Sequence, residues 1–374
     1  MPELTIILPC RNEEKALDSC LKEIKSTISR NNLDAEIIVS DSSIDSSPVI
    51  ARRHKVKLIK HNKEGYGIAY LEAFKQSKGK YVFMADCDGT YDFKEIPKFL
   101  KFLRKGYDLV IGDRFKGKMD PDSMPPLHRY VGNPVLSGLF RMFFRSRVND
   151  VHCGMRAINK ESLDKLNLRT TGMEFASEMV IKAVKNSMKI KEIPINYHSR
   201  QGESKLRSLS DGWRHLRFML LYSPIFLFLI PGLILFLLGI SSIFWLYFGN
   251  PSILGLKLFY HPMFLSALLI ISGYQLIIFS VFAKAYAINH LGERSDQFEN
   301  LCRHITIERA SILGLIMAIS GIIIYLSVFF KWIGSGFGAI QEIKNSILAL
   351  TFIILGIQTI FSSFMLSILA IKEK

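Results

Sequence analysis

The chain has 374 residues and a formal net charge of +15, from 48 Lys and Arg against 33 Asp and Glu. Its length predicts two or three domains. The positive charge favours an anionic partner, such as a phosphate-bearing substrate or an anionic membrane surface, and the basic flanks of membrane helices explain part of it. The sequence contains no motif of an RNA- or DNA-binding module, so we expect no nucleic-acid partner.

Five cysteines are scattered along the chain, and none forms a C-x-x-C pair or a cluster with zinc-site spacing. An odd, scattered set indicates reduced thiols in a cytosolic environment. The N-terminal sequence MPELTIILPCRNEE has neither a basic segment nor a cleavage site, so we expect no signal peptide. The chain is therefore expected to begin with a folded domain.

Short apolar runs rich in β-branched residues alternate with segments of helical spacing in residues 1–205. This alternation predicts βαβ units and an α/β domain with a mostly parallel sheet. The predicted helices lie between the first two strands and at 66–76, 93–104 and 174–185. The predicted strands are 4–9, 36–41, 56–61, 81–86, 108–113 and 189–198.

Residues 206–222 have an apolar face and a basic face at helical spacing. The apolar face carries Leu209, Trp213, Leu216 and Leu220, and the opposite face carries Arg207, Arg214 and Arg217. This pattern predicts an amphipathic helix at a membrane surface. An ordinary surface helix of the soluble domain is the alternative.

Four long apolar segments follow, at about 225–248, 262–287, 310–330 and 346–371. Each is long enough to cross a bilayer, and a large soluble helical core is disfavoured because the segments lack a polar face. Basic residues are more frequent in the connection between the second and third segments than in the outer loops, which places the N-terminal domain in the cytosol. The expected organisation is a cytosolic domain over 1–205, an interfacial helix over 206–222 and a membrane domain over 223–374.

Asp86 and Asp88 follow the apolar run 81–85 and precede Gly89. Two carboxylates this close together are costly without a counter-charge, so we expect a cation to bind here. Oxygen ligands suit Mg²⁺ or Mn²⁺, which bridge to substrate phosphates. A solvated turn is the alternative for an isolated Asp-x-Asp, but the position after a buried strand favours the metal site.

Polar residues also follow the first two predicted strands. In LPCRNEE, Arg11, Asn12 and Glu13 lie at the edge of the sheet, where Asn12 is expected to cap the next helix, and capping alone is the alternative role. Asp41 is placed to accept a hydrogen bond from a nucleobase, or to form only a turn with its neighbours. In KEGYGIA, Gly67 permits close backbone approach to a ligand.

These motifs occur together in one order: P-C-R-N-E, V-S-D-S-S, G-Y-G and D-C-D. In this combination, residues 3–205 resemble glycosyltransferase family 2, whose nucleotide-sugar-binding domain has the GT-A fold. The resemblance implies that the nucleotide is held by Pro9, Arg11, Glu13 and Asp41, and the metal on its diphosphate by Asp86 and Asp88. We assign Asn12, Gly67 and Arg114 to the donor site as well. The family's usual aspartate pair after the second strand is Ser40-Asp41 here, so one base-contacting carboxylate remains.

Four further segments, VIGDRF, DVHCGMRAI, MEFASEM and SRQGESKL, resemble the polyprenyl- and dolichyl-phosphate sugar synthases. The resemblance implies transfer of a hexose from a UDP- or GDP-sugar to a lipid phosphate, by a protein that carries a C-terminal membrane region. The cations in these segments exceed what one metal-bound diphosphate requires, and a second phosphate accounts for them. We assign to the acceptor phosphate Arg156, Arg200, Ser204 and Lys205. A basic patch beside the membrane is the alternative for Arg200 and Lys205.

Family 2 enzymes invert the anomeric carbon, with charge building up on the departing diphosphate. A phosphate acceptor needs little help from a base, whereas a hydroxyl acceptor needs one. Asp150, which we favour, and Glu178 are the candidates to orient or deprotonate the acceptor, and a structural pairing with an arginine is the alternative for each.

Three other functions are alternatives for this sequence. A processive polysaccharide synthase usually carries Q-x-x-R-W before its membrane region, whereas this chain has SDGWRHL. An enzyme acting on a lipid hydroxyl or a growing glycan and a non-catalytic membrane partner that keeps the sugar-nucleotide fold are the remaining alternatives. Intact Asp86 and Asp88 count against the non-catalytic protein. A homo-oligomer formed through the membrane region is also among the expectations.

Overall fold

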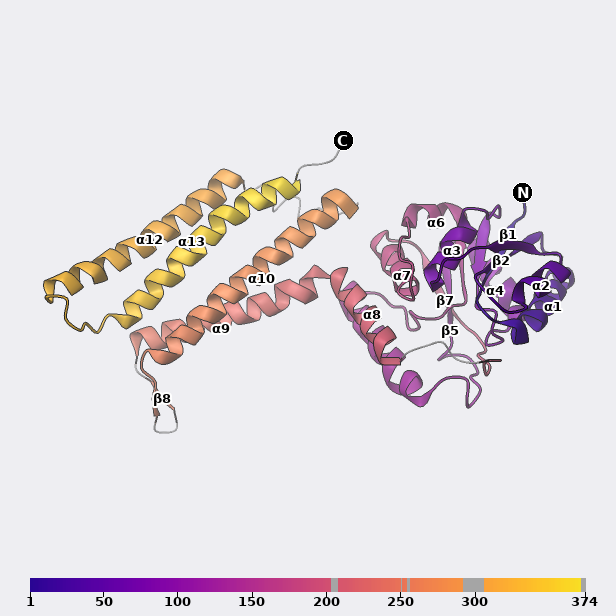
Figure 1. The fold of residues 1–374 in the computed structure, drawn as a ribbon, viewed down its shortest axis with the longest axis horizontal. Coiled ribbons are helices and arrows are strands. Elements are labelled where there is room, and N and C mark those ends of the chain that lie inside the picture. Colours follow the sequence, from indigo (N-terminus) through magenta and orange to yellow (C-terminus); the bar gives the residue numbers. More distant parts are fainter. Residues whose placement is uncertain (203–207, 250, 254–255, 292–305, 371–374) are drawn as a thin grey trace. The chain divides into compact units, whose positions relative to one another are not determined.

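The structure is a computed structural model that describes residues 1–202, 208–249, 251–253, 256–291 and 306–370. The chain forms two compact units, Met1–Tyr222 and Ser223–Lys374. The first holds a mixed α/β sheet with surrounding helices, and the second holds long apolar helices (Figure 1).

Seven strands of the described residues form the sheet of the first unit, in the order β3-β2-β1-β4-β6-β5-β7. The strands are β1 (Leu4–Cys10), β2 (Ala35–Asp41), β3 (Lys57–Lys60), β4 (Tyr81–Met84), β5 (Leu109–Asp113), β6 (Arg156–Asn159) and β7 (Ile190–Pro194). The pairs β1–β2, β1–β4, β2–β3 and β5–β7 are parallel, and β6 runs antiparallel to β4 and β5. The predicted mostly parallel α/β sheet is confirmed.

Strand β6 was not predicted, because its four residues begin with an arginine and show no apolar run. The predicted helices are present. The structure has three further helices that were not predicted: α2 (Ser47–Arg53), α5 (Asn133–Phe144) and α6 (Lys160–Leu166). The helices are α1 (Glu14–Arg30), α2 (Ser47–Arg53), α3 (Tyr66–Phe74), η1 (Phe93–Glu95), α4 (Ile96–Arg104), η2 (His128–Gly132), α5 (Asn133–Phe144), α6 (Lys160–Leu166) and α7 (Phe175–Lys185).

Helix α8 (Ser208–Leu221) packs against α5 and α7 of the first unit. Met219 is fully buried, and the Ser177 hydroxyl and His215 Nδ1 share a hydrogen bond of 2.8 Å. Trp213 and Leu221 are exposed on the same helix. The helix is thus a packed part of the first unit, and its contact with a membrane surface stays a prediction.

The second unit contains four helices, among its described residues, that are long and apolar enough to cross a membrane, as predicted. They are α9 (Ile230–Phe248), which follows the π-helical turn η3 (Ile225–Leu229), α10 (His261–Leu291), α12 (Ile307–Gly334) and α13 (Ile343–Ala370). A short hairpin, β8 (Ser252–Ile253) and β9 (Leu256–Lys257), joins α9 to α10. The helices lie side by side in the order α9, α10, α13, α12 (Figure 1).

Candidate active site

The carboxyl ends of β1, β2 and β4 meet at one edge of the sheet. Cys10 of β1 is in register with Asp41 of β2, and β4 ends at Met84, opposite Ile7 of β1. Proline at position 9 is compatible with this central strand, because β4 pairs with β1 only from Leu4 to Ile7. The polar loops that follow the three strands therefore share one rim, as ligand sites in open α/β sheets do.

Asp88 is buried at this rim, and its carboxylate is held from two sides. Oδ1 accepts hydrogen bonds from the backbone N–H of Thr90 at 3.1 Å and from its hydroxyl at 2.6 Å. Oδ2 accepts one from Arg200 Nη1 at 2.9 Å, and Nη2 of the same guanidinium pairs with Glu13. Arg200 therefore joins the loop after β1 to the loop after β4.

The segment that carries Arg200 runs along the Asp-x-Asp loop. Tyr197 forms a β-bridge with Tyr91, and the backbone N–H of Gln201 donates to the carbonyl of Asp88 at 2.9 Å. Arg200 Nε is buried and, within the described part of the chain, has no hydrogen-bond partner. A buried N–H donor without an acceptor is costly, and an oxygen of a bound ligand at this position would complete the hydrogen bonding of Arg200.

Asp86 lies two residues beyond the end of β4, and the pKa of its carboxyl group is raised. Burial and the neighbouring charge of Asp88 raise the pKa of Asp86 to about 7, against a smaller lowering by hydrogen bonding from Tyr66. A Cβ atom at position 154 would lie 2.8 Å from Asp86 Oδ2 and 3.1 Å from the hydroxyls of Tyr66 and Tyr91. Glycine at 154 therefore lets the DVHCGMRAI segment pack directly on Asp86.

Asp86 is expected to make the metal-free protein less stable as the pH rises from 3.8 to about 7. In this interval the folded protein holds a proton that the unfolded chain releases near the ordinary pKa of 3.8, so raising the pH favours unfolding. Asp86→Asn removes this effect. The measurement is the melting temperature of wild type and variant with a chelator present. The melting temperature of the variant minus that of wild type should be larger at pH 8 than at pH 5. An equal difference at both pH values would contradict the raised pKa.

The predicted donor-side residues are engaged with one another or with neighbouring loops. Asp41 is fully buried, and its oxygens accept from the Ser43 N–H at 3.2 Å and from Lys60 Nζ at 2.8 Å. Lys60, for which the sequence gives no signal, therefore occupies an oxygen of the carboxylate that is expected to accept from the base. Arg11 is exposed and forms an ion pair with Glu64 at 2.7 Å.

Asn12 does not cap the first helix, which corrects the prediction. It has a positive φ of 53°, and the helix begins after Glu13 with no side-chain cap. The Asn12 side chain instead accepts from the Ile44 N–H at 2.9 Å, and its own N–H donates to Ser43 Oγ at 2.7 Å. Asn12 therefore ties the loop after β1 to the loop after β2.

Gly67 and Glu178 both serve the loop at 169–171. A Cβ atom at position 67 would lie 2.2 Å from the carbonyl oxygen of Thr170, so the close approach at this glycine is to protein backbone and not to a ligand. Glu178, also fully buried, accepts hydrogen bonds from the N–H groups of Arg169 and Thr170 and from the Thr170 hydroxyl. Lys182 completes its surroundings with an ion pair at 2.7 Å. Glu178 thus holds a loop and has its oxygens occupied.

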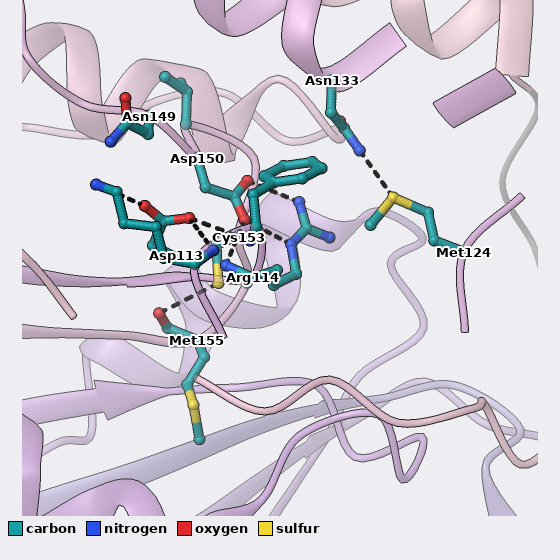
Figure 2. A network of polar contacts seen from close by, with 12 residues as sticks. Asp113, Arg114, Met124, Asn133, Asn149, Asp150, Cys153 and Met155 are labelled. Atoms are coloured by element: carbon teal, nitrogen blue, oxygen red, sulfur yellow. Dashed lines mark hydrogen bonds and ion pairs between the residues drawn. The ribbon is translucent and has the colours of Figure 1, made fainter. Parts of the chain in front are cut away.

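Asp150 and Arg114 form a buried ion pair (Figure 2). Arg114 Nε and Nη2 donate to the two carboxylate oxygens at 2.7 and 2.8 Å, and the backbone N–H of Arg114 adds a third bond at 3.1 Å. The pairing matches the alternative for Asp150, a structural partner of an arginine. Two of the three guanidinium nitrogens of Arg114 are thereby engaged by Asp150, and the assignment of Arg114 to the donor site stays a prediction. The pair links the end of β5 to the DVHCGMRAI segment.

Arg156 is buried and donates all three guanidinium nitrogens to backbone carbonyls. The acceptors are the carbonyl oxygens of Cys153, Ala176 and Val151, at 2.6, 2.6 and 2.7 Å. This geometry corrects its assignment to the acceptor phosphate, since the side chain is turned into the protein and holds the loop before β6. Of the remaining acceptor residues, Arg200 is at the rim, and Ser204 and Lys205 lie outside the described residues.

The rim offers a fit for a divalent cation. Within the described residues, no group of three or more His, Cys, Asp or Glu side chains could hold a metal by itself. Asp86 and Asp88 supply two hard oxygen ligands, and burial together with the charge of Asp88 raises the pKa of Asp86. Such a set suits an ion that completes its shell with waters and substrate phosphate oxygens, as Mg²⁺ does. The donor chemistry of the two carboxylates therefore fits Mg²⁺ or Mn²⁺.

Comparisons with known proteins place this geometry in a family. Residues 5–166 match the model of glycosyl transferase family 2, and residues 281–370 match the family 2 C-terminal transmembrane region. The low-salt glycan biosynthesis hexosyltransferase Agl6 of Haloferax volcanii is 36% identical over 98% of this chain and 88% of its own length. The dolichyl-phosphate hexose transferase of the same organism is 34% identical over 56% of this chain and 89% of its own.

A solved structure with a similar fold, glucosyl-3-phosphoglycerate synthase from Mycobacterium tuberculosis, is 18% identical. It covers 59% of this chain and 78% of that one with a TM-score of 0.46. The assignment depends instead on the family models and on the relative that matches along nearly the whole chain. By these matches, the chain belongs to glycosyltransferase family 2, and it is a membrane-type member with a C-terminal transmembrane region.

Proposed function

We propose that this protein is an inverting glycosyltransferase that moves a hexose from a UDP- or GDP-sugar to a polyprenyl or dolichyl phosphate at the cytosolic membrane face. The observation that carries the proposal is the position of Arg200. This residue of the SRQGESKL segment bridges Glu13 and Asp88 and keeps a buried Nε without a partner among the described residues. The relationship to the dolichyl-phosphate hexose transferase of Haloferax volcanii supports the lipid phosphate acceptor.

The engaged state of the predicted bases favours a phosphate acceptor over a hydroxyl acceptor. Asp150 is committed to Arg114, and Glu178 to the loop at 169–170. A hydroxyl nucleophile needs a base within hydrogen-bond reach, whereas a phosphate monoester is already anionic near neutral pH. A site whose two candidate bases are occupied is therefore suited to a lipid phosphate.

In the proposed reaction, an oxygen of the lipid phosphate forms a bond to the anomeric carbon from the side opposite the nucleotide. The bond from that carbon to the nucleoside diphosphate breaks, and its electron pair leaves with the diphosphate. Asp86 and Asp88 would hold Mg²⁺ or Mn²⁺, which offsets negative charge on the departing diphosphate when bound. Arg200 would offer its Nε–H to a phosphate oxygen, while its Nη1 and Nη2 stay paired with Asp88 and Glu13. Thr90 keeps Asp88 in place.

The test uses the full chain in liposomes that contain dolichyl phosphate. UDP- and GDP-hexoses, each radiolabelled in the sugar, are supplied with Mg²⁺ or Mn²⁺, and label in the extracted lipid is counted. We expect one donor to label dolichyl phosphate, dolichol with a free hydroxyl to stay unlabelled, and a chelator to abolish transfer. Label on dolichol, or no metal-dependent transfer from any of these donors, would overturn the proposal. Proton coupling at the anomeric carbon of the product reports inversion.

A further inference from the structure

Two glutamines form a polar contact in the middle of the membrane unit. Gln358 of α13 donates from Nε2 to Gln275 Oε1 of α10 at 3.2 Å. Gln275 lies at the centre of the apolar span His261–Asn289, and Gln358 lies close to the centre of Ile343–Leu369. Both carboxamides are therefore near the midplane of a bilayer, where hydrogen-bonding groups have no water and unpaired ones are costly.

The contact leaves hydrogen-bonding capacity unused. Gln358 Oε1 is buried and has no hydrogen-bond partner among the described residues. Gln275 is exposed, and its exposed neighbours on the same helical face, Leu268 and Phe279, are apolar. A carboxamide has two N–H donors and an oxygen with two acceptor positions, so one shared bond satisfies only part of the Gln275 amide. The amide faces outward from the helix layer, where lipid tails offer neither donor nor acceptor.

We propose that the face of α10 that carries Gln275 is a self-association surface and that its partner is a second copy of this chain. Two Gln275 side chains facing each other across a two-fold axis satisfy one another, since each N–H donates to the opposite Oε1. A lipid tail cannot do this, and the midplane lies out of reach of phosphate headgroups. Large apolar side chains around the amide, Leu268 at 58% and Phe279 at 41% exposure, supply van der Waals contact for the same interface.

The arrangement of the helices leaves this face open. The four helices pack as a layer in which α10 contacts α9 on one side and α13 on the other. On α13, Ile354 and Phe361 are exposed beside Gln358 in the helical repeat. A second copy laid against the α10/α13 seam would therefore cover apolar surface on both helices together with the central amide. A closed two-fold pair needs only one such face for each copy.

The experiment measures energy transfer between donor- and acceptor-labelled copies of the full chain in liposomes, at increasing lipid dilution. Wild type should associate, and Gln275→Leu should weaken association about tenfold, the loss expected for a pair of interhelical hydrogen bonds. Ser320→Leu is the matched control, because Ser320 is exposed near the middle of α12 and bonds to its own helix at Ile316. This control should associate like wild type.

Disulfide cross-linking provides a second test, which still applies if Gln275→Leu disturbs folding. Gln275→Cys should form a disulfide-linked dimer under a membrane-permeant oxidant, because the two-fold axis brings equivalent positions together. Ser320→Cys at a similar depth should not. Wild type that stays monomeric at all dilutions, equal association of Gln275→Leu and wild type, or equal cross-linking at positions 275 and 320 would each overturn the proposal. None of these measurements depends on sugar transfer.

Discussion

Replacing Asp88 by asparagine is expected to lower sugar transfer about 100- to 1000-fold, the loss typical when one preorganised electrostatic group is removed from a transition state. Asparagine has nearly the shape of aspartate and keeps one oxygen that can accept from Thr90, while its amide nitrogen replaces the oxygen that accepts from Arg200. The substitution therefore removes a charge without emptying the site. The negative charge on the departing diphosphate grows in the transition state, and the metal held by Asp88 would offset it. We therefore expect kcat to fall along with the affinity for Mn²⁺.

The matched control is Asp92→Asn, four residues further along the chain. Asp92 caps η1 by accepting from the Lys94 N–H at 3.0 Å, and asparagine caps a helix equally well. This variant should keep nearly full transfer. The measurements are initial rates over a range of Mn²⁺ concentrations, with equal melting temperatures as evidence of folding. If Asp88→Asn kept more than about a tenth of wild-type transfer at saturating Mn²⁺, Asp88 would carry less than the electrostatic contribution assigned to it.

The local parts of this site could be predicted from the sequence. Asp86 and Asp88 stand out because two charges end an apolar run, and the strand that precedes them fixes their place at the rim. The membrane helices could also be predicted, because a run of about 20 apolar residues is typical of a transmembrane helix. Such signals need only neighbouring residues, which a single sequence contains.

The pairings between distant segments could not be predicted. Arg114 and Asp150 are separated by 36 positions, and Arg200 and Glu13 by 187. A sequence shows that a charge exists and gives no direct sign of which opposite charge it meets after folding. For the same reason, the arginine of DVHCGMRAI seemed a phosphate ligand, although its true acceptors are backbone carbonyls. Every residue has a backbone carbonyl, so the sequence does not show which carbonyls will accept these hydrogen bonds.

Strand β6 shows how one unrecognised element changes the interpretation of several residues. It lies antiparallel between β4 and β5 and brings Arg156 into register with Met84. The loop before it then packs on Asp86 through Gly154. A glycine between a cysteine and a methionine gave no functional signal in the sequence, yet a Cβ atom at this position would lie 2.8 Å from Asp86 Oδ2. The absence of a side chain at Gly154 therefore allows this segment to contact Asp86.

The second large effect is expected at the buried pair of Arg114 and Asp150. Their side chains are 8% and 0% exposed, so breaking the pair leaves an uncompensated charge in the interior. Asp150→Ala is expected to lower the free energy of unfolding by about 3–5 kcal/mol. For a unit of this size, that corresponds to a fall in melting temperature of roughly 10 °C. The Asp120→Asn variant is the control, since the Asp120–His198 pair is exposed and should contribute less than about 1 kcal/mol.

A double variant separates structure from catalysis at the same pair. Arg114→Met with Asp150→Leu removes both charges and keeps similar volume, so most of the lost melting temperature should return. If Asp150 acts only by holding Arg114 and the loop before β6, transfer at low temperature should return along with stability. If Asp150 is instead the base that the sequence suggested, the double variant should be stable and inactive, whereas Arg114→Lys, which keeps the Asp150 carboxylate and a positive charge beside it, should keep transfer. Melting temperature and initial rate, measured on the same detergent-solubilised preparation, therefore decide between a structural carboxylate and a catalytic one.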